Sequence, residues 1–183
     1  VSVGTGPVGV AVDGTYVWVT NYGGGTGNTV TRITKSDLST TTITVGTGPT
    51  GVAVDGTYAW VANRGSNDVT RITKSTSITT TITAGTGPFG VAVDGTYCWV
   101  SNKDSANVTR ILKSDLSTTT VFVGTGPRAV AVDATYCWVA NRDSNDVTRI
   151  LKSDLSTTTI AVGTTPVSLG DMTGFAYDNY ANQ

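Results

Sequence analysis

The chain has 183 residues with 12 basic and 13 acidic side chains, and its formal net charge is −1. That length is enough for one domain with a sizeable core. The balanced charge excludes the strong basic excess that nucleic acid and anionic membranes attract, and no run of 18 apolar residues could span a bilayer. Histidine and glutamate are absent, so an enzyme would lack the commonest general base and half of the usual carboxylates.

Four copies of one motif organise the chain. Gly-Thr-Gly-Pro occurs at residues 4–7, 46–49, 85–88 and 124–127, and a diverged fifth copy begins at Gly163. The copies begin 42, 39, 39 and 39 residues apart, and periods near 40 are typical of propellers and helical arrays. About one residue in five is threonine, which suits a half-solvated strand surface, and no segment has helical spacing of apolar residues. The repeats therefore predict strands.

The second copy reads as four antiparallel strands. Residues 51–54 form a short apolar run after Pro49, and Asp55-Gly56 is a strong hairpin signal that predicts a type I′ turn. The return strand covers 58–62, and polar loops then lead to strands at 68–73 and 79–83. Four strands in about 39 residues make one blade of a β-propeller.

We therefore predict an all-β fold, a single β-propeller domain of four complete four-stranded blades and a partial fifth. The expected blades cover residues 7–45, 49–84, 88–123 and 127–162, and the partial blade combines 166–183 with 1–3. If these end segments join, the ring has five blades, which we prefer. If they do not, two blade faces stay bare, which predicts a homo-oligomer or filament, or further sequence.

Two strings carry a resemblance to a known family. Residues 51–56 (Gly-Val-Ala-Val-Asp-Gly) and 60–69 (Trp-Val-Ala-Asn-Arg-Gly-Ser-Asn-Asp-Val) resemble the repeats of YVTN-type β-propellers, which are related to NHL-type propellers. The resemblance covers residues 1 to about 167. It implies a propeller that is commonly found on secreted or cell-surface microbial proteins, and it implies no particular activity. The repeats also resemble those of the virginiamycin B lyase type, whose catalysis involves a histidine and a glutamate that this chain lacks.

Positions that differ between repeats point to a binding face. In a propeller, the loops that enter each blade and the loops between its second and third strands emerge at one end. Phe89 and Arg128 follow the repeated proline on neighbouring blades, so an aromatic ring and a cation would lie near the mouth of the central channel. Our candidate site for a ligand or partner comprises Phe89, Arg128, Arg64, Lys103, Arg142 and Tyr22.

Residues repeated in every blade are better explained by structure. The tryptophans are expected to pack between sheets rather than form a ligand cage, and the hairpin aspartates to bond local backbone rather than ring a cation. The repeated arginines and lysines are expected to form a solvated rim paired with Asp37, Asp115 and Asp154, with an anion-binding ring as the alternative. Cys98 and Cys137, at equivalent positions of adjacent blades, are expected to be two separate buried thiols. These sets are Trp18, Trp60, Trp99 and Trp138; Asp13, Asp55, Asp94 and Asp133; Arg32, Arg71, Arg110 and Arg149; Lys35, Lys74, Lys113 and Lys152.

The expected function is that of a non-catalytic structural, protein-interaction or adhesion module, extracellular or on a cell surface. A carbohydrate-binding propeller is the alternative and would need exposed aromatic platforms; a lyase-type enzyme is disfavoured because histidine and glutamate are absent. No catalytic residue, metal or cofactor is expected, nor binding to nucleic acid or insertion into a membrane; a protein or glycan is the expected partner. Asn107 lies in a sequon for N-glycosylation, and the threonine-rich strands could carry O-glycans.

Overall fold

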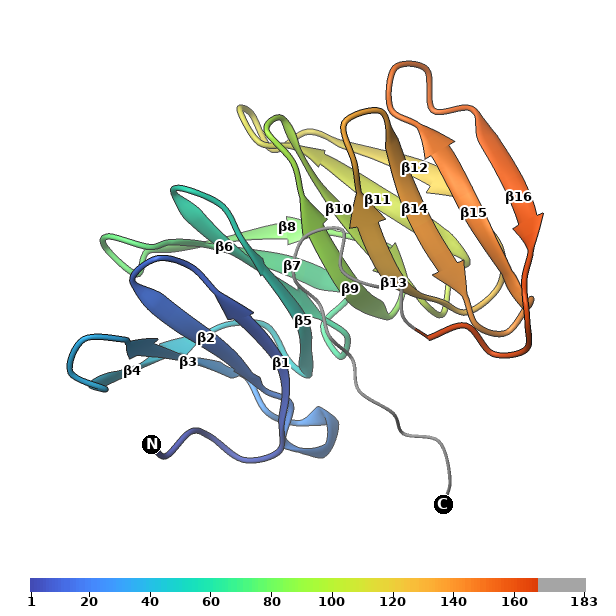
Figure 1. Ribbon diagram of the computed structural model, residues 1–183. Helices are drawn as coiled ribbons and strands as arrows, with labels where there is room; N and C mark the ends of the chain where they lie inside the picture. The colour runs from blue at the N-terminus through green and yellow to red at the C-terminus, as the bar shows by residue number, and fades with distance from the viewer. Residues whose placement is uncertain (168–183) are drawn as a thin grey trace.

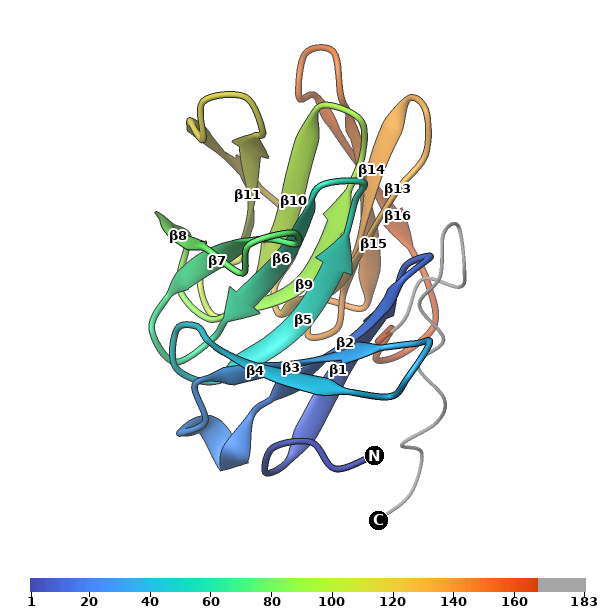
Figure 2. The same ribbon diagram turned by 90° about the vertical axis from the view of Figure 1, so that its left-hand side faces the viewer.

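A computed structural model describes residues 1–167, which form four antiparallel sheets of four strands each. Figure 1 shows the sheets following one another along an arc, from the blue sheet near the N-terminus to the orange one. In Figure 2, turned by 90°, the same order runs from front to back. Each sheet is one blade, and the strands of a blade pair in chain order.

The strand bounds repeat from blade to blade. Blade 1 contains β1 (Pro7–Val12), β2 (Tyr16–Asn21), β3 (Thr29–Thr34) and β4 (Thr40–Thr44), with a short 3-10 turn η1 (Gly23–Gly25) between β2 and β3. Blade 2 contains β5 (Pro49–Val54), β6 (Tyr58–Asn63), β7 (Asp68–Thr73) and β8 (Thr79–Thr83). Blade 3 contains β9 (Pro88–Val93), β10 (Tyr97–Asn102), β11 (Asn107–Leu112) and β12 (Thr118–Phe122). Blade 4 contains β13 (Pro127–Val132), β14 (Tyr136–Asn141), β15 (Asp146–Leu151) and β16 (Thr157–Ala161).

These bounds confirm the strands predicted from the repeat. The first strand of each blade is innermost, since β1 contacts β5, β5 contacts β9 and β9 contacts β13. The last strand of each blade is outermost and exposes its threonines to solvent, as at Thr118, Thr119 and Thr120. Residues 1–3 are not in a strand, and the C-terminal part of the predicted fifth blade, from residue 168, lies outside the described residues. Within residues 1–167 there is no helix of the length and hydrophobicity that a membrane span needs.

The core is divided among the junctions between blades. Each sheet has a leading face, which packs on the blade before it, and a trailing face, which packs on the blade after it. At the junction of blades 1 and 2, Trp18 and Val30 of the trailing face meet Val52 and Val61 of the leading face. The same arrangement recurs between blades 2 and 3 and between blades 3 and 4. The prediction that the tryptophans pack between sheets is confirmed for Trp18, Trp60 and Trp99, which have no exposed surface.

The first hairpin of each blade is tight, but it is not the predicted type I′ turn. Asp55 and Gly56 lie outside the positive-φ region that this turn requires. Instead, one carboxylate oxygen of Asp55 accepts hydrogen bonds from the backbone N–H groups of Thr57 and Tyr58, both at 2.8 Å. The aspartate side chain therefore makes the turn, as Asx turns do. This explains why Ala134 can replace the glycine in blade 4.

Candidate functional site

Two kinds of loop gather at one end of the molecule, which we call the loop face together with the first two strand residues that follow each entry connection. Its segments are the connections that enter blades 2 to 4 (residues 46–48, 85–87 and 124–126) and the loops between second and third strands (22–28, 64–67, 103–106 and 142–145). Backbone bonds tie the two kinds of loop together: the N–H groups of Arg64 and Lys103 donate to the carbonyls of Gly48 and Gly87, both at 2.9 Å. The side chains that differ between blades therefore project from loops whose backbones are held in place by hydrogen bonds.

Phe89 and Arg128 form a contact pair on this face. They are the second residues of β9 and β13, two innermost strands that lie beside each other. The guanidinium carbon of Arg128 is 5.1 Å from the centre of the Phe89 ring, within the range of a cation–π interaction. Both residues are half-buried, so each still offers surface to a partner. The structure therefore joins two residues that the sequence placed on neighbouring blades.

A second group on the loop face is centred on Asp104. Lys103 Nζ lies 3.1 Å from one of its carboxylate oxygens, and Arg64 Nη2, from blade 2, lies 3.5 Å from the other. Burial alone would raise the pKa of Asp104, but its hydrogen bonds and charge interactions with Lys103 and Arg64 outweigh burial and lower that pKa. The group carries one net positive charge at neutral pH.

Asp104 was missed by the sequence analysis, although a signal existed. The loops after the repeated asparagine read Asn-Arg-Gly-Ser in blade 2 but Asn-Lys-Asp-Ser in blade 3, so the acidic residue is itself a difference between repeats. Of the other predicted residues, Arg142 pairs with Asp143 in its own loop at 3.3 Å. Tyr22 lies in the glycine-rich insertion of blade 1, where its carbonyl accepts bonds from Gly25 and Gly27.

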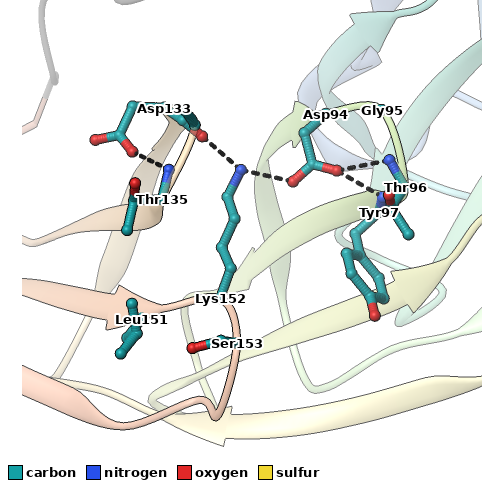
Figure 3. A pocket seen from close by; sticks show the side chains of 10 residues that line it. Asp94, Gly95, Thr96, Tyr97, Asp133, Thr135, Leu151, Lys152 and Ser153 are labelled. Atoms are coloured by element: carbon teal, nitrogen blue, oxygen red, sulfur yellow. Dashed lines mark hydrogen bonds and ion pairs between the residues drawn. The ribbon is translucent and has the colours of Figure 1, made fainter.

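At the opposite end, which we call the hairpin end, lysines link successive blades. Lys74 Nζ lies 2.9 Å from a carboxylate oxygen of Asp13, Lys113 lies 3.0 Å from Asp55, and Lys152 lies 2.8 Å from Asp94. Each lysine also donates to the backbone carbonyl of its own blade's hairpin aspartate, as Lys152 does to Asp133 at 2.6 Å (Figure 3). A hollow of about 560 Å³ lies around Lys152 between the hairpins of blades 3 and 4.

These links correct the prediction of a solvated basic rim. The paired side chains are only 14–17% exposed, and they bridge adjacent blades rather than pair with Asp37, Asp115 or Asp154. The repeated arginines also differ from the prediction, because they stack on the tyrosine of their own blade. The guanidinium carbon lies 4.4 to 4.7 Å from the tyrosine ring centre in all four blades. The arginines and three of the four repeated lysines therefore serve packing, and Lys35 of blade 1 is the exposed exception.

The hairpin aspartates are held as carboxylates. Burial would raise the pKa of Asp13, but hydrogen bonds from the backbone of Tyr16, from Lys74, from the backbone of Thr15 and from the Trp18 indole lower it to about 2. The pKa values of Asp55 and Asp94 are lowered by equivalent bonds, against the same effect of burial. A carboxylate with so low a pKa and with its oxygens occupied is a poor general base.

The two cysteines and the asparagine of the glycosylation sequon are all buried. Cys98 and Cys137 are separate buried thiols, as predicted, and burial raises the pKa of both. Asn107 is 7% exposed, and its amide nitrogen donates to the carbonyl of Ser105 at 3.0 Å. This placement argues against Asn107 as a glycosylation site in the folded chain.

Comparison with known proteins establishes the class. No protein-family model and no curated protein matches the sequence. Among solved structures, the fold is similar to a streptogramin B lyase structure (TM-score 0.77, 16% identity, 87% of this chain and 55% of that one) and to hydrazine synthase of Kuenenia stuttgartiensis (TM-score 0.73, 20% identity, 88% and 52%). It is also similar to U3-55K (TM-score 0.77, 15% identity, 88% and 54%).

At these identities the likeness concerns the fold alone. Together with the four repeated sheets, it shows that the chain is an all-β protein of the β-propeller class. The chain spans about half the length of these solved structures.

Proposed function

We propose that this chain is a non-catalytic β-propeller module of an extracellular or cell-surface protein, and that its loop face binds a protein partner. The observation that carries the proposal is the gathering of blade-specific side chains on that face. Phe89 with Arg128, and Asp104 with Lys103 and Arg64, are contact groups formed from residues of different blades. Aromatic and arginine side chains are also enriched at protein interfaces, and arginine is among the residues that most often dominate the free energy of binding there.

The use of the repeated polar residues supports a non-catalytic role. The hairpin aspartates hold turns and bond lysines, and the cysteines are buried with raised pKa values. Groups engaged in this way lack the freedom that a nucleophile or general base requires. Burial of Trp18, Trp60 and Trp99 likewise counts against the carbohydrate-binding alternative, because of the four repeated tryptophans only Trp138 is partly exposed.

Membership of the YVTN-type propellers is part of the proposal. The asparagine of the Trp-Val-Ala-Asn string is buried in blade 2, where the amide nitrogen of Asn63 donates to Asp68 at 2.7 Å and to the Thr70 hydroxyl at 2.8 Å. It thus fixes the loop between β6 and β7, which gives the motif residue a physical role. Sequences intermediate between this chain and YVTN-type propellers would establish the relationship.

The proposed surface location is supported by the outer strands. Their exposed threonine hydroxyls are accessible for O-glycans of the kind found on extracellular proteins. An intact mass that exceeds the sequence mass by hexose units, measured on protein from its natural source, would agree with this location. An unmodified mass would remove this support.

The binding proposal is tested with alanine variants. The immobilised chain is used to capture a partner from a surface-protein extract, and the affinity of the identified partner is then measured for the wild type and for Phe89→Ala, Arg128→Ala and Arg64→Ala. We expect at least one variant to bind about 10- to 100-fold more weakly, as for an interface hot spot. Thr120→Ala, on the exposed outer strand β12, is the control and should bind as the wild type does. Unchanged affinity in all three loop-face variants would refute the proposal.

A further inference from the structure

Both ends of the row of blades leave an apolar face bare. On the leading face of blade 1, Val10 is 51% exposed, whereas its equivalents Val52, Val91 and Val130 are 0 to 8% exposed. Val12 on the same face is 57% exposed. On the trailing face of blade 4, Ile160 is 38% exposed, whereas the equivalent Ile43, Ile82 and Val121 are 5 or 6% exposed. Apolar patches of this kind mark association surfaces.

The two bare faces match each other in the way that the internal junctions do. Each internal junction sets a tryptophan and an isoleucine or valine of one blade against valines and an isoleucine of the next. Blade 4 carries the first set, with Trp138 and Ile160, and blade 1 carries the second, with Val10, Val19 and Ile33. Blade 4 therefore presents the surface that the leading face of blade 1 fits.

The charges at the hairpin end are complementary too. Three lysines bond the hairpin aspartate of the blade before them. Lys35 of blade 1 is the fourth such lysine; it is exposed, and among the described residues it bonds the carbonyl of Asp13 in its own blade, at 3.0 Å. Asp133 of blade 4 is the fourth such aspartate. Docking blade 1 on blade 4 would add a Lys35–Asp133 link equivalent to the other three.

We propose that the trailing face of blade 4 binds the leading face of blade 1 in a second copy of this chain. A second copy is the occupant that carries the matching apolar and charged residues in the correct order. The chain spans 50 to 59% of the solved propellers that it resembles, so two copies supply enough blades for a ring. Eight blades lie within the usual range of propellers, roughly four to eight.

One position makes this junction weaker than the internal ones. Gly9, Gly51 and Gly90 lie where a Cβ atom would be 2.2 to 2.4 Å from a carbonyl oxygen of the next blade's innermost strand. Blade 4 has Ala129 at this position, so its methyl group meets the Val8 carbonyl of an incoming copy. The association is therefore concentration-dependent, and removing that methyl group strengthens it.

Sedimentation velocity over a concentration series tests the proposal. We expect the wild type to pass from monomer to dimer or closed assembly, and Ala129→Gly to do so at a concentration at least about 10-fold lower. Ala134→Gly, at an exposed hairpin tip, is the matched control and should associate as the wild type does. Val10→Asp and Ile160→Asp should each weaken association about 100-fold, because each would bury a carboxylate in an apolar contact. Phe122→Asp, at a 75% exposed position outside both end faces, should not.

Mixing the variants separates this junction from other modes of association. Val10→Asp leaves the trailing face of blade 4 unchanged, and Ile160→Asp leaves the leading face of blade 1 unchanged. An equimolar mixture should therefore form heterodimers, although each variant alone is monomeric. Tryptophan fluorescence and melting temperature check that each variant is folded. Wild type and Ala129→Gly that both stay monomeric would overturn the proposal, as would a mixture that fails to associate. The first result would mean that these faces bind another partner or other segments of the chain.

Discussion

At the scale of single residues, the hairpin aspartate has the most functions. Asp13 closes a turn, accepts a hydrogen bond from the Trp18 indole at 3.3 Å and pairs with Lys74 of the next blade at 2.9 Å. Deprotonation of this residue therefore stabilises a hairpin, the orientation of a core side chain and a junction between blades.

This leads to a prediction about acid stability. The pKa of Asp13 is 3.8 in an unperturbed chain and about 2 in the fold, so the folded state binds fewer protons and the stabilisation is present above about pH 4. It should be lost as the pH falls from about 4 to about 2, by roughly 2 kcal/mol for this residue. Urea unfolding followed by tryptophan fluorescence should show Asp13→Asn less stable than the wild type at pH 7, with the difference shrinking below pH 4. A difference that stays constant down to pH 2 would contradict this account.

At the scale of elements, two glycines in one repeat differ in whether the local backbone conformation requires glycine. Gly48, in the connection that enters blade 2, has φ of +62°, and a Cβ atom there would lie 3.1 Å from the Gly25 carbonyl oxygen and the Gly65 nitrogen. Gly56, at the first hairpin, lies outside the left-handed region with open space around it. The second glycine of the repeated Gly-Thr-Gly-Pro motif is thus required by its backbone conformation, whereas the glycine of Asp-Gly is not.

Alanine substitutions at Gly48 and Gly56 should therefore have different effects on the free energy of unfolding. Gly48→Ala should lower the free energy of unfolding by about 1 to 2 kcal/mol, because an L-residue is strained at positive φ. Gly56→Ala should change it by less than about 0.5 kcal/mol or raise it slightly, because alanine restricts the unfolded chain. Urea denaturation at equal protein concentration measures both. Equal losses in the two variants would show that the hairpin needs glycine after all.

Features that depend on local sequence signals could be predicted, and contacts that depend on how two blades are superposed could not. Strand positions such as 68–73 follow from alternation between turn residues, and the separate buried thiols follow from the repeat register. The partner of Lys113 is an aspartate 58 residues earlier in the chain. No spacing within one repeat indicates such a pair, because it depends on how two blades are superposed. The pairing of Asp104 with Arg64 is non-local in the same way, since the two residues belong to different blades.

At the scale of the whole molecule, stability is distributed over junctions rather than concentrated in one core. Cys98 lies in the junction of blades 2 and 3, and Cys137 in that of blades 3 and 4. Among the described residues, blade 4 packs on blade 3 alone, whereas blade 3 has a neighbour on each face. A blade with one neighbour should separate at a lower free-energy cost than a blade with two.

The two thiols can report this difference. Cys98→Ala leaves Cys137 as the only thiol and Cys137→Ala leaves Cys98, and alanine is already present at the equivalent Ala59. At low protein concentration, we expect Cys137 to react with a thiol reagent faster than Cys98, and both to react far more slowly than in the unfolded chain, because burial raises their pKa and blocks access. Equal rates for the two thiols would indicate that the blades open as a single cooperative unit.

The recurrence of one connection at every entry to a blade has a consequence for how such chains change in length. Excision of residues 88–126 would join Gly87 to Pro127 and regenerate Gly-Thr-Gly-Pro. The side of blade 2 that carries Trp60 would then receive blade 4 through Val130, Cys137 and Ile150, which replace Val91, Cys98 and Ile111 with residues of the same type. Duplication of the same 39 residues would insert one further blade, with Gly-Thr-Gly-Pro at each of its connections. Loss or duplication of this repeat therefore keeps the same residue types at the junctions that it changes, and the number of blades can vary while the fold is kept.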